Sequence, residues 1–184
     1  MAKRRGLPDY IKPGVRVLFV GINPGMRSAA LGHHFAGYSN RFWKLLFASG
    51  LVDTPLTFAD DWRLPKWGFG LTNLVARSTP GIDALSPKEY AAGRARLLAK
   101  IRRYRPRVVA LLGVTLYPIL CPAKQGTPGA QSRVRPGLQS DTLAGAHVFL
   151  LPNPSARNAH YSYEDMLRTF HALKRYMLPA DWKH

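Results

Sequence analysis

Acidic residues and cysteine are both scarce in this chain of 184 residues. Ten Asp and Glu face 27 Lys and Arg, so the formal net charge is +17. Self-repulsion among so many like charges opposes a compact fold, which makes a polyanionic partner the favoured explanation for the imbalance. Charge alone leaves DNA, the ribosome and anionic membranes open as that partner, and solubility remains the alternative explanation.

Long apolar runs are also missing, and the only cysteine is Cys121. One cysteine cannot form an internal disulfide, which fits a reducing cytoplasm. No run approaches the roughly 20 apolar residues that a membrane-spanning helix needs. The basic amino-terminal segment, about 1–12, contains Pro8 and Asp9 where a signal peptide has an apolar stretch. We therefore expect one domain over 1–184, cytoplasmic, monomeric and without membrane attachment.

Apolar segments and amphipathic segments alternate along the chain. Short apolar runs predict buried strands at 15–20, 69–75, 107–113 and 147–151. Helical spacing predicts helices at 39–49, 86–104 and 162–177, the second opened by the capping box Ser86-Pro-Lys-Glu89. The segment of about 122–145, rich in Gly, Pro and Gln, is predicted to be a surface loop. This alternation favours a three-layer α/β/α domain with a parallel sheet.

Two Asn-Pro turns follow predicted strands directly. Asn23-Pro24 comes after the first strand and Asn153-Pro154 after the fourth. Open parallel sheets bind ligands beyond the carboxyl ends of their strands. The sequence therefore predicts a site at that edge, with both asparagines in it.

Five motifs carry a resemblance to a known family. They are Gly21-Ile-Asn-Pro-Gly25, Gly32-His-His-Phe35, Asn40-Arg-Phe-Trp43, Gly70-Leu-Thr-Asn73 and Asn153-Pro-Ser-Ala-Arg157. In this order and spacing the set closely resembles the mismatch-specific uracil/thymine DNA glycosylase family, a branch of the uracil-DNA glycosylase superfamily. The resemblance extends from about Pro13 to Met177. It implies a four-stranded parallel sheet flanked by helices, and hydrolysis of the N-glycosidic bond without cofactor or metal.

The resemblance also implies two catalytic residues. Asn23 matches the first catalytic motif; asparagine cannot take a proton, so it would orient a water by accepting its hydrogen bond. Asn153 stands where the superfamily commonly has a histidine, and its amide would stabilise the departing base anion more weakly. For Asn23 the alternative role is a turn residue that satisfies its own backbone.

Further residues match positions that contact the base or the duplex. The residues expected at the base are Ile22, Ser28, His34, Phe35, Asn40 and Asn73. Phe35 would stack on the base, and its alternative is a core phenylalanine. Ser155, Ala156 and Arg157 match the loop that enters the duplex, and the alternative for Arg157 is a surface arginine. His33 and His34 lack the further ligands of a metal site.

The predicted function is a monofunctional DNA glycosylase that flips uracil out of G·U mismatches in double-stranded DNA. Thymine opposite guanine and modified pyrimidines are the further substrates we expect. The rivals are a non-catalytic nucleic-acid-binding module on the same fold and an RNA binder. Asp83 follows Asn73 closely enough to approach the site, although a solvated loop acid is the favoured interpretation.

Overall fold

The computed structural model describes residues 6–122, 134–155 and 157–178. Five strands alternate with helices along this part of the chain. In chain order the elements are β1 (Val17–Gly21), α1 (Met26–Leu31), α2 (Phe42–Ala48), the 3-10 helix η1 (Phe58–Trp67), β2 (Phe69–Asn73), the 3-10 helix η2 (Ile82–Ala84), α3 (Pro87–Tyr104), β3 (Val108–Leu112), α4 (Leu116–Leu120), β4 (Gly137–Leu143), β5 (Ala146–Leu151) and α5 (Tyr163–Met177).

The strands form one sheet in the order β2-β1-β3-β5-β4. β2, β1, β3 and β5 are parallel, and these are the four strands that the apolar runs predict. The register pairs Gly21 at the end of β1 with Asn73 at the end of β2. The carboxyl ends of the parallel strands therefore lie together at one edge of the sheet.

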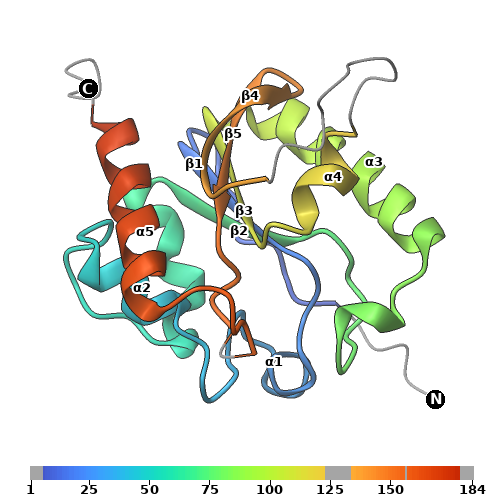
Figure 1. Cartoon of the computed structure of the whole chain (residues 1–184), viewed down its shortest axis with the longest axis horizontal. Helices are drawn as coiled ribbons and strands as arrows, with labels where there is room; N and C mark the ends of the chain where they lie inside the picture. Colours follow the sequence, from blue (N-terminus) through green and yellow to red (C-terminus); the bar gives the residue numbers. More distant parts are fainter. Residues whose placement is uncertain (1–5, 123–133, 156, 179–184) are drawn as a thin grey trace.

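Helices cover both faces of this sheet, which confirms the three-layer architecture. In Figure 1, α2 and α5 lie on one side of the strands, and α3 and α4 on the other. Alternation along β1 supplies the two cores, because successive strand side chains point to opposite faces. Val17 and Phe19 pack in the α2 and α5 layer, whereas Leu18 and Val20 pack in the α3 and α4 layer.

The two long helices begin where their capping signals predict. Ser86 and Glu89 form a reciprocal capping box at the start of α3, with proline at the first turn. Ser162 and Asp165 do the same for α5. Because α3 follows β2 and α5 follows β5, both helices start close to the carboxyl edge of the sheet and run back along its faces (Figure 1).

The prediction of a surface loop over about 122–145 is wrong for its last part. β4 occupies Gly137–Leu143 and pairs antiparallel with β5 as the outer strand of the sheet. Ala144 and Gly145, both with positive φ, make the tight turn of this hairpin. β4 shows little apolar alternation because most of its residues are exposed or half-buried at the sheet edge. Residues 123–133 of the predicted loop lie outside the described part.

Several short elements have no counterpart in the sequence prediction, namely α1, η1, η2 and α4. The predicted helix at 39–49 is shorter, since α2 begins at Phe42 and ends at Ala48. None of the helices in the described ranges combines the length and the apolar composition needed to cross a membrane.

Candidate active site

The polar residues of the predicted site meet at the carboxyl edge of the parallel strands. In Figure 1, α1 and the segments that follow β1, β2 and β5 gather along the lower side of the molecule. Asn23 follows β1, Asn73 ends β2 and Asn153 follows β5. Both Asn-Pro turns therefore lie at the edge where parallel sheets bind ligands.

The amide of Asn23 is oriented by two acceptors from the loop that follows β2. Its Nδ2 donates to the Arg77 carbonyl at 3.0 Å and to the Thr79 hydroxyl oxygen at 2.7 Å. That hydroxyl donates its own hydrogen to the Gly81 carbonyl at 2.7 Å, so toward Asn23 it can only accept. Because both partners are acceptors, the Nδ2 must point at them. Its Oδ1 receives no hydrogen bond from the described residues and remains an acceptor.

Asn153 has the opposite arrangement. Its Oδ1 accepts from the Ser155 backbone N–H at 2.9 Å, and its backbone carbonyl accepts from the Asn158 amide at 3.0 Å. Within the described ranges, no acceptor takes a hydrogen bond from its Nδ2. The loop after β5 thus holds Asn153 as a hydrogen-bond donor, whereas the loop after β1 holds Asn23 as an acceptor.

Phe35 and Asn73 lie against the end of β1, where only glycine leaves room. A Cβ on Gly21 would lie 2.5 Å from Asn73 Oδ1 and 3.5 Å from the Phe35 ring. The Phe35 ring packs on Phe42, with ring centroids 4.3 Å apart. Phe35 also has a φ of 53°, in the left-handed region that phenylalanine rarely adopts. An aromatic ring is thereby held in a strained turn beside the carboxyl ends of β1 and β2.

His34, directly before this ring, is buried and belongs to a hydrogen-bonded cluster. Its Nε2 lies 2.8 Å from the Pro8 carbonyl, which can only accept, so Nε2 carries the hydrogen. The lone pair on Nδ1 then faces the Asn73 amide nitrogen at 3.5 Å. Burial lowers the pKa of His34 below its ordinary value, which favours the neutral ring. The structure thus places His34 next to Asn73, and their contact with a base stays a prediction.

Ser28 and Asn40 use their side chains to hold the loops. The buried Ser28 hydroxyl accepts from the Ala36 backbone N–H at 3.0 Å. Asn40 Oδ1 accepts from the Phe42 backbone N–H at 3.0 Å, at the start of α2. Ile22 is buried, and its carbonyl accepts from the Val75 N–H at 2.9 Å. Contact of these three residues with a base stays a prediction.

Arg157 joins two loops of the site. Its Nη1 donates to the Pro80 carbonyl at 2.7 Å, across 77 residues of sequence. Ser155 Oγ accepts from the Arg157 backbone N–H at 3.4 Å. Ala156, which the sequence places between them, lies outside the described residues. The Pro80 carbonyl belongs to the same loop that orients Asn23, so this loop contacts both predicted catalytic and predicted wedge residues.

Two supports of the site were missed from sequence. Asp61 of η1 is fully buried and accepts from the His34 backbone N–H at 2.9 Å, with His33 Nδ1 at 3.1 Å from its other oxygen. Thr79 orients Asn23. Both partners are distant in sequence, so spacing could not reveal them. For Asp61 one signal existed, because it is one of only ten acids in the chain.

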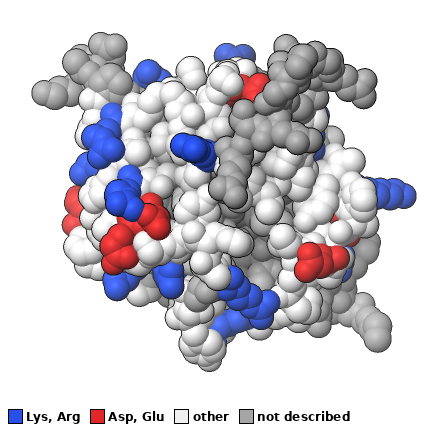
Figure 2. Space-filling model, in the orientation of Figure 1, with Lys and Arg blue, Asp and Glu red and all other residues white. Residues whose placement is uncertain are grey.

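Asp83 lies in η2 and is exposed, which agrees with the interpretation as a solvated loop acid. No group of three or more His, Cys, Asp or Glu side chains gathers at a possible metal site in the described part of the chain. Figure 2 shows Lys and Arg spread over the visible face, with Asp and Glu limited to a few separate patches.

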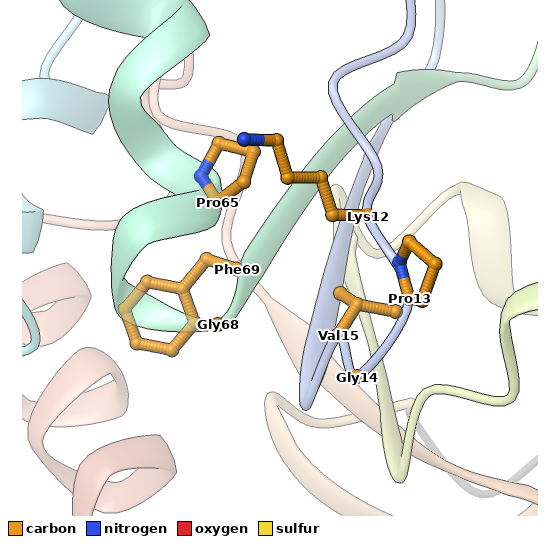
Figure 3. Close-up of a pocket in the computed structure, with 7 residues that line it drawn as sticks. All are labelled: Lys12, Pro13, Gly14, Val15, Pro65, Gly68 and Phe69. Carbon is orange, nitrogen blue, oxygen red and sulfur yellow. The ribbon is translucent and has the colours of Figure 1, made fainter.

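Two cavities lie outside the arrangement of Asn23, Phe35 and Asn153. A cavity of about 40 Å³ lies at the amino ends of β1 and β2, and Figure 3 shows its lining residues: Lys12, Pro13, Gly14, Val15, Pro65, Gly68 and Phe69. A second cavity of about 240 Å³ is lined by Gly6, Leu7, Asp9, Asn73, Leu74, Ala76, Arg96 and Lys100. The first cavity lies at the edge opposite the carboxyl ends of the strands, where parallel sheets usually bind ligands. The second cavity shares only Asn73 with the predicted site.

The fold defines an α/β protein whose candidate site lies beyond the carboxyl ends of four parallel strands. Residues 8–174 match the model of the uracil DNA glycosylase superfamily, and the chain belongs to this superfamily. Membership makes it a DNA repair glycosylase, a hydrolase of N-glycosidic bonds whose partner is DNA.

A solved structure of similar fold supports the architecture. It is a solution NMR structure from Methanosarcina acetivorans, described as that of a candidate uracil DNA glycosylase. The TM-score is 0.58 at 15% sequence identity, and the alignment covers 93% of this chain and 98% of that chain. At this identity the likeness concerns the fold alone.

Proposed function

We propose that this glycosylase removes uracil from G·U mismatches in duplex DNA and leaves an abasic site. The observation that carries the proposal is the fixed amide of Asn23, which presents its Oδ1 at the carboxyl edge while its Nδ2 is held by Arg77 and Thr79. Thymine opposite guanine and modified pyrimidines are further substrates of the same site.

The proposed reaction needs a placed water more than a strong base. Asparagine cannot remove a proton at neutral pH, but its Oδ1 can accept a hydrogen bond from water and so orient it. This suffices when the bond to the base is largely broken before water attacks, because the sugar then carries the positive charge. Positioning the nucleophile is a large part of the catalysis in such a reaction.

The base leaves as an anion, and Asn153 is the donor that the proposal assigns to it. The Oδ1 of Asn153 is occupied by the Ser155 N–H, so its Nδ2 is the group that faces a ligand. A neutral amide stabilises an anion less than a protonated histidine does. We therefore expect good leaving groups, such as pyrimidines with electron-withdrawing substituents, to react faster.

The aromatic wall and the wedge loop complete the proposal. Phe35 would stack on the extruded base, and Asn73 would donate to it from the amide that also faces His34. Arg157 would leave the Pro80 carbonyl and fill the gap in the duplex. Bases in mismatches are extruded at a lower cost than paired bases, which gives part of the selectivity.

Cleavage of a G·U duplex, followed by alkali, tests the proposed function. We expect strand scission at the uracil by the wild-type protein. Asn23→Ala should lower the single-turnover rate by roughly 10²–10⁴ and leave duplex binding nearly unchanged. Gln139→Ala is the matched control, since Gln139 is an amide of β4 whose hydrogen bonds within the described part of the chain go to backbone carbonyls.

Two outcomes would contradict the proposal. Intact strands after treatment with wild-type protein would favour the non-catalytic binding module. Retention of more than half the wild-type rate by Asn23→Ala would remove Asn23 from the catalytic role. A panel of duplexes that differ only in the target base then ranks uracil, thymine and modified pyrimidines.

A further inference from the structure

An exposed tyrosine projects from the loop that carries Phe35. Tyr38 is 89% exposed, whereas the next most exposed large apolar side chain among the described residues, Leu178, is 62% exposed. The guanidinium carbon of Arg27 lies 3.6 Å from the centre of the Tyr38 ring. One face of the ring is therefore covered by a cation, and the high exposure leaves the other face open.

The pair is anchored to the candidate active site. Arg27 belongs to α1, and its Nε donates to the Ala36 carbonyl at 2.7 Å. The Ala36 N–H in turn donates to Ser28 Oγ at 3.0 Å. Both bonds of Ala36 tie α1 to the residue that directly follows Phe35, so they hold Arg27 near the Phe35 turn, and Tyr38 contacts Arg27 two residues after Ala36.

Arg27 retains hydrogen-bond donors for an anion. Its Nε is used by Ala36, and no ion pair with Asp or Glu involves Arg27 within residues 6–122, 134–155 and 157–178. A guanidinium has five N–H donors in a planar fork that fits phosphate oxygens. The pair thus offers an open aromatic face and a cation beside it.

We propose that Arg27 and Tyr38 form a second nucleotide subsite, in which Tyr38 stacks on a base of the substrate DNA and Arg27 binds that nucleotide's phosphate. A nucleotide supplies a flat ring and an anion close together, which is the combination that the pair can bind. The inference rests on the proposed function for the position of the DNA, with the target base at Phe35.

The distance along the chain selects the nucleotide. Tyr38 comes three positions after Phe35, so their Cα atoms are at most roughly 11 Å apart. Bases on one strand of duplex DNA follow one another at about 3.4 Å. Tyr38 is therefore within reach of a base that neighbours the target. The Tyr38 ring stacks on such a base while the target base lies at Phe35.

Binding to an uncleaved duplex tests the subsite without requiring catalysis. The probe is a G·U duplex whose target carries a 2′-fluoro substituent that blocks hydrolysis, and anisotropy gives Kd at several salt concentrations. We expect Tyr38→Ala and Tyr38→Leu to weaken binding by about 5- to 50-fold with an unchanged salt slope, since stacking of one base is lost. Tyr38→Phe keeps the ring and should stay within about twofold of wild type.

Arg27 has a different expected signature. Arg27→Ala should weaken binding and reduce the slope of log K against log salt by about 0.9, the value for one phosphate contact. The control is Arg103→Ala. Arg103 also lies over a tyrosine ring, that of Tyr104 at 5.3 Å, but at the carboxyl end of α3, near the start of β3 and so at the sheet edge opposite the candidate site. It should leave both Kd and slope unchanged. Thermal unfolding of each variant verifies the fold.

A fluorescent base analogue locates the contact. With 2-aminopurine beside the target, wild-type protein and Tyr38→Phe should quench its emission more than Tyr38→Leu does. Wild-type affinity and quenching in Tyr38→Leu would overturn the subsite, even if the protein cleaves uracil. Weaker binding by Tyr38→Leu in a protein that cleaves no uracil would support the subsite while the proposed function fails.

Discussion

Asn23 donates its amide hydrogen to the hydroxyl oxygen of Thr79 at 2.7 Å, and Thr79 passes its own hydrogen to the Gly81 carbonyl. This chain of two bonds has one direction, because a carbonyl can only accept. The orientation of the Asn23 amide is therefore set jointly by the Arg77 carbonyl and by a threonine 56 residues away in the sequence. The buried Thr79 hydroxyl thus helps to leave the Asn23 Oδ1 as the atom that can accept a hydrogen bond.

Thr79→Val tests this relationship, since valine keeps the shape and removes the acceptor. The amide of Asn23 then retains only the Arg77 carbonyl, and we expect the single-turnover rate to fall by roughly tenfold, with duplex affinity nearly unchanged. Thr169→Val is the control, because Thr169 bonds the Asp165 carbonyl within α5. Equal rates for wild type and Thr79→Val would show that the Arg77 carbonyl alone orients the amide and that Thr79 has no part in the reaction.

Arg157→Ala should affect duplex and single-stranded substrates unequally. Extrusion costs a few kcal/mol in a duplex and far less in a single strand, so loss of a wedge harms the duplex reaction selectively. We expect at least tenfold lower activity on duplex G·U or G·T and a much smaller loss on any single-stranded uracil that is cleaved. Equal losses on both, with a flatter salt dependence, would identify Arg157 as a phosphate contact.

The net charge of +17 predicts a steep salt dependence of duplex binding. Neutralised phosphates release counterions, so log K should fall linearly with log salt by about 0.9 per phosphate contact. We expect a slope that corresponds to four or more contacts in an anisotropy titration of the wild-type protein. A slope near zero would show that the positive charge makes no phosphate contacts and does not serve DNA binding.

His34 predicts how stability depends on pH. Burial lowers the pKa of His34, while the nearby charges of Asp61 and Asp9 oppose this shift and His33 adds to it. In the unfolded chain the pKa is about 6.5, so the unfolded state binds the proton first as the pH falls. The contribution of the neutral ring to stability is complete above about pH 6.5 and is lost below it.

Thermal unfolding between pH 5 and 8 measures this effect. We expect the Tm of wild type to fall below about pH 6.5 and the fall to be smaller in His34→Gln. His171→Gln, a change on α5, should keep the wild-type profile. Identical pH profiles for His34→Gln and wild type would show that another group causes the acid sensitivity.

The apolar patterns were sufficient to predict four strands and three helices, because those elements bury a continuous face. β4 was missed, since an edge strand with polar residues such as Gln139 and Asp141 has no such face. The edge on which Asn23 and Asn153 lie followed from parallel topology. The orientation of their amides did not, because Thr79 and the Ser155 N–H are fixed by folded loops. The bond between Asp61 and the His34 backbone N–H could not be predicted either, because it forms only when η1 packs beside His34 in the folded protein.

The turn at Phe35 couples thermal stability to repair activity, because a change that stabilises the turn also moves the Phe35 ring. The strained φ at Phe35 disfavours folding, and the fully buried Asp61 holds the same turn in place through the His34 backbone N–H. Selection of variants for heat resistance alone would relax this turn first, through glycine at 35. Such variants would lose the ring on which, in the proposed function, a base stacks. An engineered, heat-resistant glycosylase must therefore gain its stability elsewhere, for example in the hairpin of β4 and β5.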